Sequence, residues 1–154
     1  MDIDQSDEEP GALENAFSHL QCILVARRTR YTPEAVSWAQ YDILELLRLQ
    51  GPMTPSLLGD RLGAARTGIS KALRVLKDLN LVEQMQGDGD RREQVTALTQ
   101  QGRDFLVRAA TGRRDAAHCV MAALTPGEQA MFTELCEKVS AALTAHEAEQ
   151  GASS

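Results

Sequence analysis

Apolar residues recur at three- and four-residue spacing through the first part of the chain. Leu13, Phe17, Leu20 and Leu24 therefore share one face of a helix with about 3.6 residues per turn. The pattern stops at Tyr31-Thr32-Pro33, because the residue before a proline avoids the helical conformation. A long amphipathic helix is predicted from about residue 12 to residue 30.

A second helix is predicted from Ser37 to Gly51. The hydroxyl of Ser37 is placed to cap its N-terminus, and Gly51 ends it. Its apolar stripe consists of Trp38, Tyr41, Leu44 and Leu47–Leu49.

Two closely spaced helices follow. Thr54-Pro55 combines a capping hydroxyl with proline at the first helical position, and it predicts a short helix that stops at Gly63. A fourth helix runs from about Arg66 to Leu79, and Asn80 suits its left-handed C-terminal cap. The buried face of the fourth helix is predicted to consist of Ile69, Ala72, Leu73, Leu76 and Leu79.

The period of the pattern changes after residue 80. Val82–Met85 and Gln94–Leu98 are short strand-like runs, and the loop between them, rich in glycine and aspartate, predicts a hairpin. Thr99 is placed to cap a fifth helix of roughly 24 residues, about 36 Å long, which Gly112 can bend. Thr125-Pro126-Gly127-Glu128 is a capping box that opens a sixth helix. The fold class is therefore mostly α, with a small β hairpin.

Three residues in the middle of the chain have the spacing of a helix-turn-helix. Gly59 on the third helix allows a second helix to approach, Gly63 makes the turn, and Ile69 anchors the fourth helix. Any tight helix pair can imitate this spacing. The hairpin that follows directly makes it the pattern of a winged helix.

The composition is that of a single globular domain. The chain has 154 residues, of which 43% are hydrophobic and 25% charged, and this excludes a mostly disordered chain. No apolar run is long enough to cross a bilayer, and the N-terminus is acidic, so neither a membrane nor a secreted protein is expected. Three cysteines cannot form a disulfide framework, so we expect reduced thiols in a cytoplasmic protein.

Charge is distributed unevenly along the chain. Residues 1–14 carry six acidic residues and no basic one, and residues 115–154 carry six acidic residues and one lysine. Residues 61–114 hold eleven Arg and Lys against six Asp and Glu, a net charge of +5. An anionic partner would therefore bind the middle of the chain, although a solvated surface is the alternative.

The outward face of the fourth helix carries hydroxyls and long cations. Thr67, Ser70, Lys71, Arg74 and Lys77 lie opposite the apolar face, and such groups can reach base edges and phosphates from a recognition helix. Gly68 lowers helix propensity by about 1 kcal/mol relative to alanine. Its missing side chain can admit the backbone close to a groove, and a plain propensity defect is the alternative.

The hairpin tip is the second basic element. Arg91 and Arg92 lie at the end of its loop, where they can enter a narrow minor groove. Asp90 can hold an adjacent arginine by a charge-assisted hydrogen bond. An ordinary polar turn is the alternative.

From Tyr41 to about Leu106 the sequence resembles the MarR family of bacterial winged-helix transcription regulators. The segments that carry the resemblance are Leu57-Leu58-Gly59-Asp60-Arg61-Leu62-Gly63, Arg66-Thr67-Gly68-Ile69-Ser70-Lys71, Leu76–Val82, Asp90-Arg91-Arg92 and Val95-Thr96-Ala97-Leu98-Thr99-Gln100-Gln101-Gly102. The resemblance implies a homodimer that binds double-stranded DNA at a pseudo-palindromic operator, usually as a repressor released by a ligand or by oxidation. Ala65, where the family usually has a capping serine, and Gly68, where a threonine is common, depart from the pattern.

The expected DNA-binding residues lie at the start of the third helix, on the fourth helix and in the hairpin loop. They are Thr54, Ser56, Arg66, Thr67, Gly68, Ser70, Lys71, Arg74, Arg91 and Arg92, with Asp90 supporting the wing.

The chain is predicted to form one unit over residues 12–150. Residues 37–102 form the DNA-binding head, residues 12–36 and 103–150 form dimerisation helices, and residues 1–11 and 151–154 form tails. The sixth helix carries Met131, Phe132, Leu135, Val139 and Leu143. The apolar stripes of the long helices exceed what a small winged helix can cover, so burial against a second copy is expected.

Two kinds of effector are compatible with the sequence. A small anionic aromatic molecule can bind in a cleft bordered by Arg27, Arg30, Tyr31, Trp38 and Tyr41, although core packing of Trp38 and Tyr41 is slightly favoured. The resemblance also raises redox sensing through Cys22 or Cys119, with buried inert thiols as the default for all the cysteines.

Catalysis, metal binding and a cofactor are not expected. His19, His118 and His146 are widely separated, and His19 with Cys22 lacks a third member. The leading prediction is a dimeric DNA-binding regulator, and the alternative from another class is a winged helix whose basic face binds an acidic protein.

Overall fold

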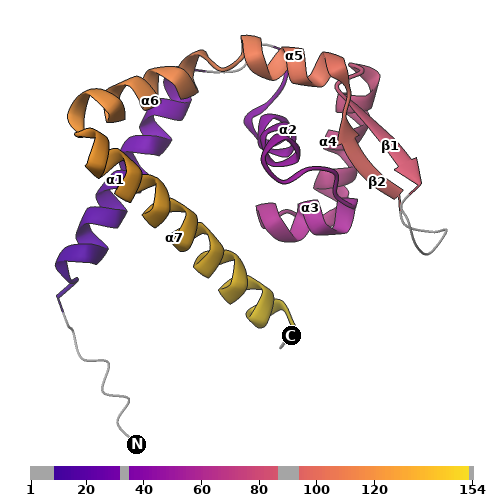
Figure 1. Cartoon of the computed structure of the whole chain (residues 1–154). Coiled ribbons are helices and arrows are strands. Elements are labelled where there is room, and N and C mark those ends of the chain that lie inside the picture. Colours follow the sequence, from indigo (N-terminus) through magenta and orange to yellow (C-terminus); the bar gives the residue numbers. More distant parts are fainter. Residues whose placement is uncertain (1–8, 32–34, 87–93, 153–154) are drawn as a thin grey trace, which may run out of the picture. The chain divides into compact units, whose positions relative to one another are not determined.

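A computed structural model describes residues 9–31, 35–86 and 94–152. The chain divides into two compact units, Met1–Thr32 and Pro33–Ser154. The first unit contains the helix α1 (Ala12–Arg30), which has the predicted bounds and buries none of its residues (Figure 1). Its apolar stripe is exposed, with Phe17 and Leu20 each 41% accessible.

The second unit holds a helical head with a two-stranded hairpin, followed by two further helices (Figure 1). Its elements are α2 (Trp38–Gln50), α3 (Pro55–Leu62), α4 (Arg66–Asp78), β1 (Val82–Gln86), β2 (Gln94–Leu98), α5 (Gln100–Arg108), α6 (Thr111–Ala123) and α7 (Pro126–Ala152). This order confirms the predicted winged-helix fold class. None of the described helices is both long and apolar enough to span a membrane.

The predicted capping residues begin four of these helices, namely α2, α3, α5 and α7. Ser37 forms a capping box with Gln40 at α2, and the hydroxyl of Thr99 accepts a bond of 2.9 Å from the backbone N–H of Gly102 at α5. Thr125 and Glu128 form the predicted box at α7, where the Glu128 carboxylate accepts from the Thr125 backbone N–H at 2.8 Å. Local side-chain hydrogen bonds therefore set these helix starts.

The hairpin is antiparallel, with Val82 paired with Leu98 and Gln86 paired with Gln94. Met53 adds a short bridge to Thr96, through backbone hydrogen bonds of 3.0 and 2.7 Å. The sheet thereby joins the loop before α3. The buried core lies beneath it and consists of Val36, Tyr41, Ile43, Leu44, Leu47, Met53, Leu58, Ile69, Leu73, Leu76, Leu81, Val82, Leu98 and Leu106.

The prediction of one continuous fifth helix is wrong. The chain forms two helices there, and the break lies at Ala109–Ala110, before Gly112. Leu106 and Ala110 are 1% and 0% exposed, whereas no residue of α6 is buried. The break therefore lies where the chain leaves the core, and packing outweighs the high helix propensity of the two alanines.

Two smaller differences concern surface exposure and a helix end. Leu49, expected in the stripe of α2, is 64% exposed, and Ile43 is buried instead. The final helix continues through Ala152, two residues into the expected tail.

Candidate nucleic-acid interface

The turn between α3 and α4 has the close packing that its glycines predict. A Cβ added to Gly59 would lie 3.0 Å from the Ala64 carbonyl oxygen and 3.6 Å from Cγ1 of Ile69. Gly63 has a φ of +59°, in the left-handed region that favours glycine. The Ala64 backbone N–H donates to the Gly59 carbonyl at 2.9 Å. Both glycines are therefore needed for the tight turn, which holds α4 against α3.

The helix α4 has one buried face and one exposed polar face. Ile69, Leu73 and Leu76 are buried, as predicted, and they anchor the helix to the core. The exposed side chains on the other face include Thr67, Ser70, Lys71 and Arg74. The face therefore offers hydroxyl groups and two long cations to solvent. Groups of this kind donate hydrogen bonds to base edges and neutralise phosphates.

The N-terminal end of α4 contains the remaining predicted contacts. Arg66 donates from Nη2 to Oγ of Ser56 at 3.4 Å, which links α4 to the first turn of α3. The Thr54 hydroxyl already accepts from the Leu57 backbone N–H at 3.2 Å as the cap of α3. Ala65 stands at the N-cap of α4 and makes no side-chain capping bond. The backbone N–H groups of this first turn therefore lack a capping side chain at Ala65.

Gly68 lies in open space on this exposed face. A Cβ added there would meet no atom within 4 Å. Packing within the described part of the chain therefore does not require a glycine at this position. The two alternatives from the sequence therefore both stand: a binding partner approaches the backbone closely at Gly68, or the glycine only lowers helix propensity.

The strands of the wing are tied to α4 and α5. Lys77, expected on the reading face, donates from Nζ to Oε1 of Gln84 on β1 at 3.1 Å. Gly102 in α5 packs against the chain before β1, because a Cβ there would lie 2.1 Å from the Leu81 carbonyl oxygen. These contacts place the hairpin beside α4. The predicted loop residues Asp90, Arg91 and Arg92 lie outside the described residues.

A charged cluster between α2 and α6 was missed by the sequence interpretation. The Glu45 carboxylate accepts hydrogen bonds from Arg48 at 2.6 and 3.0 Å and from Arg113 at 2.9 and 3.0 Å. Burial raises the pKa of Glu45, but these two guanidinium groups outweigh it and hold the pKa below its ordinary value. The Glu45–Arg113 pair spans 68 residues of sequence, so no local pattern could have revealed it.

The expected effector-cleft residues belong to different units. Arg27, Arg30 and Tyr31 lie in the first unit, and Trp38 and Tyr41 lie in the second. The two rings of the second unit meet edge to face, with centroids 5.4 Å apart, and Tyr41 is buried in the core while Trp38 packs against it. Burial, followed by the nearby Glu45 charge, raises the pKa of Tyr41. These contacts support core packing of Trp38 and Tyr41.

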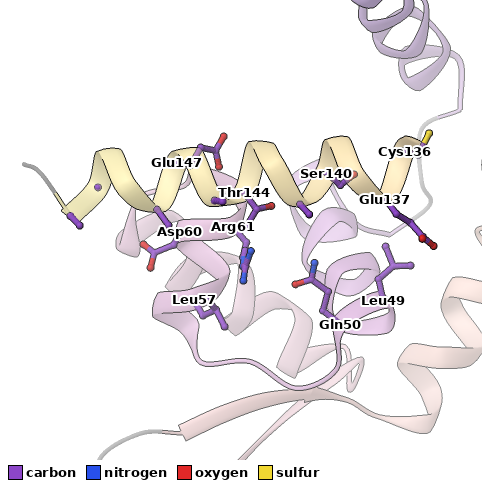
Figure 2. A pocket seen from close by; sticks show the side chains of 15 residues that line it. Leu49, Gln50, Leu57, Asp60, Arg61, Cys136, Glu137, Ser140, Thr144 and Glu147 are labelled. Carbon is purple, nitrogen blue, oxygen red and sulfur yellow. The ribbon is translucent and has the colours of Figure 1, made fainter. Parts of the chain in front are cut away.

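A broad groove runs along α7 on the side that faces α2 and α3 (Figure 2). Leu49, Gln50 and Leu57 line one side, and small residues of α7, such as Ser140 and Thr144, line the other. Its volume of about 1220 Å³ exceeds the range of roughly 300–1,000 Å³ that is typical of small-molecule pockets. It contains none of the five predicted cleft residues.

The cysteines are more accessible than expected. Cys22, Cys119 and Cys136 are all free and exposed, so the expectation of buried thiols is wrong for the single chain. Within residues 9–31, 35–86 and 94–152, no three His, Cys, Asp or Glu side chains are grouped so as to hold a metal ion.

The order of the elements and the exposed polar face of α4 place the chain in the class of winged helix-turn-helix proteins. Residues 35–93 match the model of the MarR family, and they contain α2, α3, α4 and β1. This segment is therefore similar to the MarR family of transcription regulators. A comparison with curated protein sequences gave no match.

Several solved structures share the fold. MarR from E. coli, in its apo form, is 21% identical with a TM-score of 0.63, over 86% of this chain and 98% of that one. BpsR from Bordetella bronchiseptica, whose DNA binding is regulated by 6-hydroxynicotinic acid, is 20% identical with a TM-score of 0.61, over 84% and 99%. NadR in complex with 4-hydroxyphenylacetate is 15% identical with a TM-score of 0.72, over 88% and 96%. At these identities the likeness establishes the fold.

Proposed function

We propose that this chain is a sequence-specific DNA-binding regulator that binds a pseudo-palindromic operator as a homodimer, and that it acts as a repressor. The observation that carries the proposal is the exposed face of α4, where Thr67, Ser70, Lys71 and Arg74 lie opposite the buried Ile69, Leu73 and Leu76. The anchored apolar face fixes the helix, and the polar face is free to enter a major groove. We expect no catalytic activity.

Dimerisation is supported by apolar stripes that the single chain leaves uncovered. In α1, Leu13 and Leu24 are 84% and 49% exposed, and in α7, Leu135 and Leu143 are each 50% exposed. Helices this long with no buried residue need a partner to cover their apolar faces. A second copy provides two identical reading heads, which two-fold symmetry can set roughly 34–36 Å apart, about one turn of DNA.

The proposed effector is a small anionic aromatic molecule. Support comes from BpsR, whose DNA binding is regulated by 6-hydroxynicotinic acid, and from NadR, which was solved with 4-hydroxyphenylacetate. Arg27, Arg30 and Tyr31 remain the proposed contacts on α1 and at its end. The effector can release DNA only if it binds the DNA-incompetent state more tightly than the competent one.

Operator binding tests the main proposal. The purified chain should retain specific genomic fragments and should bind duplex from its own upstream region more tightly than random duplex. Binding should weaken steeply as salt is raised, because condensed cations are released from the phosphates. Equal affinity for upstream and random duplex would refute the regulator proposal, and preferential binding of an acidic protein would favour the alternative winged-helix function.

Variants of the reading face should separate base readout from shape readout. Lys71→Ala or Thr67→Ala should lose discrimination at particular bases, by about 1–3 kcal/mol for each contact. Arg92→Ala should weaken binding and mainly alter the preference for narrow A·T-rich flanks. Lys138→Ala is the matched control, because Lys138 is an exposed lysine on α7 that pairs with Glu134. Equal affinity of the Arg92→Ala and wild-type proteins would argue against a wing that contacts DNA.

Thiol-based redox sensing is kept as a second candidate because all three cysteines are exposed. Operator binding should be compared between the wild type and the triple Cys22→Ser, Cys119→Ser, Cys136→Ser protein, with and without mild peroxide. If peroxide releases only the wild type, redox sensing is supported over an aromatic effector. If both proteins respond only to aromatic acids, the effector proposal is supported.

A further inference from the structure

The junction between the head and α6 lacks the features that usually fix a helix in place. The chain leaves α5 at Ala109–Ala110, and α6 begins without a side-chain cap. No residue of α6 is fully buried, so apolar burial within the second unit contributes little to holding this helix. The helix nevertheless leads from the winged-helix head to α7, which carries part of the apolar surface attributed above to dimerisation.

A charged contact joins α6 to the head directly after this break. Arg113, the third residue of α6, donates from Nη1 to both carboxylate oxygens of Glu45 on α2, at 2.9 and 3.0 Å. The Glu45 side chain is only 18% exposed, and the Arg113 side chain is 39% exposed. A charge-assisted contact that is partly shielded from water is stronger than an ordinary surface pair.

The helix α2 holds the carboxylate ready for this contact. Arg48 donates from Nε and Nη2 to the two oxygens of Glu45, and the Glu45 hydrogen bond raises the pKa of Arg48. The carboxylate is thus oriented by a residue one turn away on the same helix. Tyr41, one turn earlier, is buried in the core, so this face of α2 is firmly anchored. Glu45 is therefore a fixed point on the head, to which α6 is attached through Arg113.

We propose that Glu45 and Arg113 form an ionic clamp that fixes the direction in which α6 leaves the head, and thereby sets the spacing of the two heads on an operator. They are positioning residues for DNA binding and do not contact DNA. The inference rests on the proposed function, because spacing matters only for a dimer with two reading heads. Loss of the clamp leaves the exposed face of α4 intact but lets the heads vary in separation.

Charge reversal gives a direct test. Glu45→Arg and Arg113→Glu each abolish the attraction. The double reversal is made together with Arg48→Glu, so that residue 45 keeps an oppositely charged partner on α2, and it restores the attraction with the charges exchanged. Arg114→Glu is the matched control, since Arg114 is the exposed neighbour on α6. Affinity is measured for a series of operators whose half-sites are moved apart by one or two base pairs. Thermal unfolding is recorded for each variant to verify that it is folded.

The wild type and Arg114→Glu should prefer one spacing strongly. Each single reversal should reduce this preference by about three- to tenfold, the range expected for a partly shielded ion pair, and the double reversal should recover it. A purely structural role for the pair would lower stability without changing the spacing profile. Single reversals that keep the wild-type profile, or a double reversal as defective as the singles, would overturn the clamp.

A second readout separates failure of the clamp from failure of the proposed function. Amide hydrogen exchange in residues 111–123 does not depend on DNA. Exchange there should be about three- to tenfold faster in each single reversal and near wild type in the double reversal. If the wild type has no operator preference but exchange follows this pattern, the regulator function fails and the clamp stands. Unchanged exchange in the single reversals refutes the clamp in either case.

Discussion

Replacing Gly68 with alanine adds one methyl group, and this change should affect folding stability and DNA binding in opposite directions. The residue lies in the first half of α4 on its exposed face, and an added Cβ would meet no atom within 4 Å. Gly68→Ala therefore changes the free chain through helix propensity and unfolded-state entropy, without a steric clash. The free energy of unfolding should rise by about 0.8–1.0 kcal/mol. The melting temperature should rise by roughly 2–4 °C for a chain of this size.

Operator affinity should move in the opposite direction if the glycine admits the backbone to a groove. The added methyl would then collide with the DNA, and overpacking of this kind costs about 1–3 kcal/mol. The assay pairs urea unfolding of the free protein with titration of operator duplex at one salt concentration. Proteins commonly keep a residue that lowers folding stability where that residue is needed for binding.

Gly127→Ala supplies the control for this experiment. Gly127 is also an exposed helical glycine with open space at its Cβ position, but it lies in the first turn of α7. Its replacement should stabilise the chain slightly and leave operator affinity unchanged. If Gly68→Ala stabilises the protein and binds operator as well as the wild type, then close backbone approach is wrong. If Gly68→Ala does not raise the free energy of unfolding, then the argument that the open space around Gly68 can accept a methyl group is refuted.

Three further predictions concern the core and the charged cluster. Gly102→Ala should destabilise the fold by about 1–3 kcal/mol in urea unfolding, because the new Cβ would lie 2.1 Å from the Leu81 carbonyl oxygen, and backbone cannot yield easily. Thr96→Val should stabilise the fold by about 1 kcal/mol in the same assay, because Oγ1 of Thr96 is fully buried and finds no hydrogen-bond partner in the described part of the chain. The wild type should lose stability as the pH falls below about 4.5, and Arg113→Gln should lose less. The reason is that Arg48 and Arg113 outweigh burial and depress the folded-state pKa of Glu45, so its contribution is present above the unfolded pKa and disappears on protonation.

Each of these three predictions has an outcome that contradicts it. A Gly102→Ala protein as stable as the wild type would mean that α5 can shift away from the Leu81 backbone. A Thr96→Val protein that is less stable would mean that the hydroxyl has a partner, such as a bound water. Parallel pH curves for the wild type and Arg113→Gln would show that the pair does not depress the pKa of Glu45.

The elements that could be predicted are those fixed by residues close together in sequence. The bounds of α1 follow from a regular apolar stripe, and the turn after α3 follows from Gly59 and Gly63. The caps at Ser37 and Thr99 depend on hydrogen bonds to residues three positions away. Such features need no knowledge of the tertiary structure, because the interacting groups are already neighbours along the chain.

The features that could not be predicted depend on contacts between distant segments. Alanines 109 and 110 both favour helix, so the break between α5 and α6 arises only because Leu106 and Ala110 pack into the core while the following residues leave it. The Glu45–Arg113 contact, made just after this break, joins residues 68 positions apart. Both features lie where the reading head meets the helices that carry the exposed apolar stripe. The sequence pattern therefore predicts the proposed DNA-reading surface, whereas the connection that would govern its placement on DNA emerges only from tertiary packing.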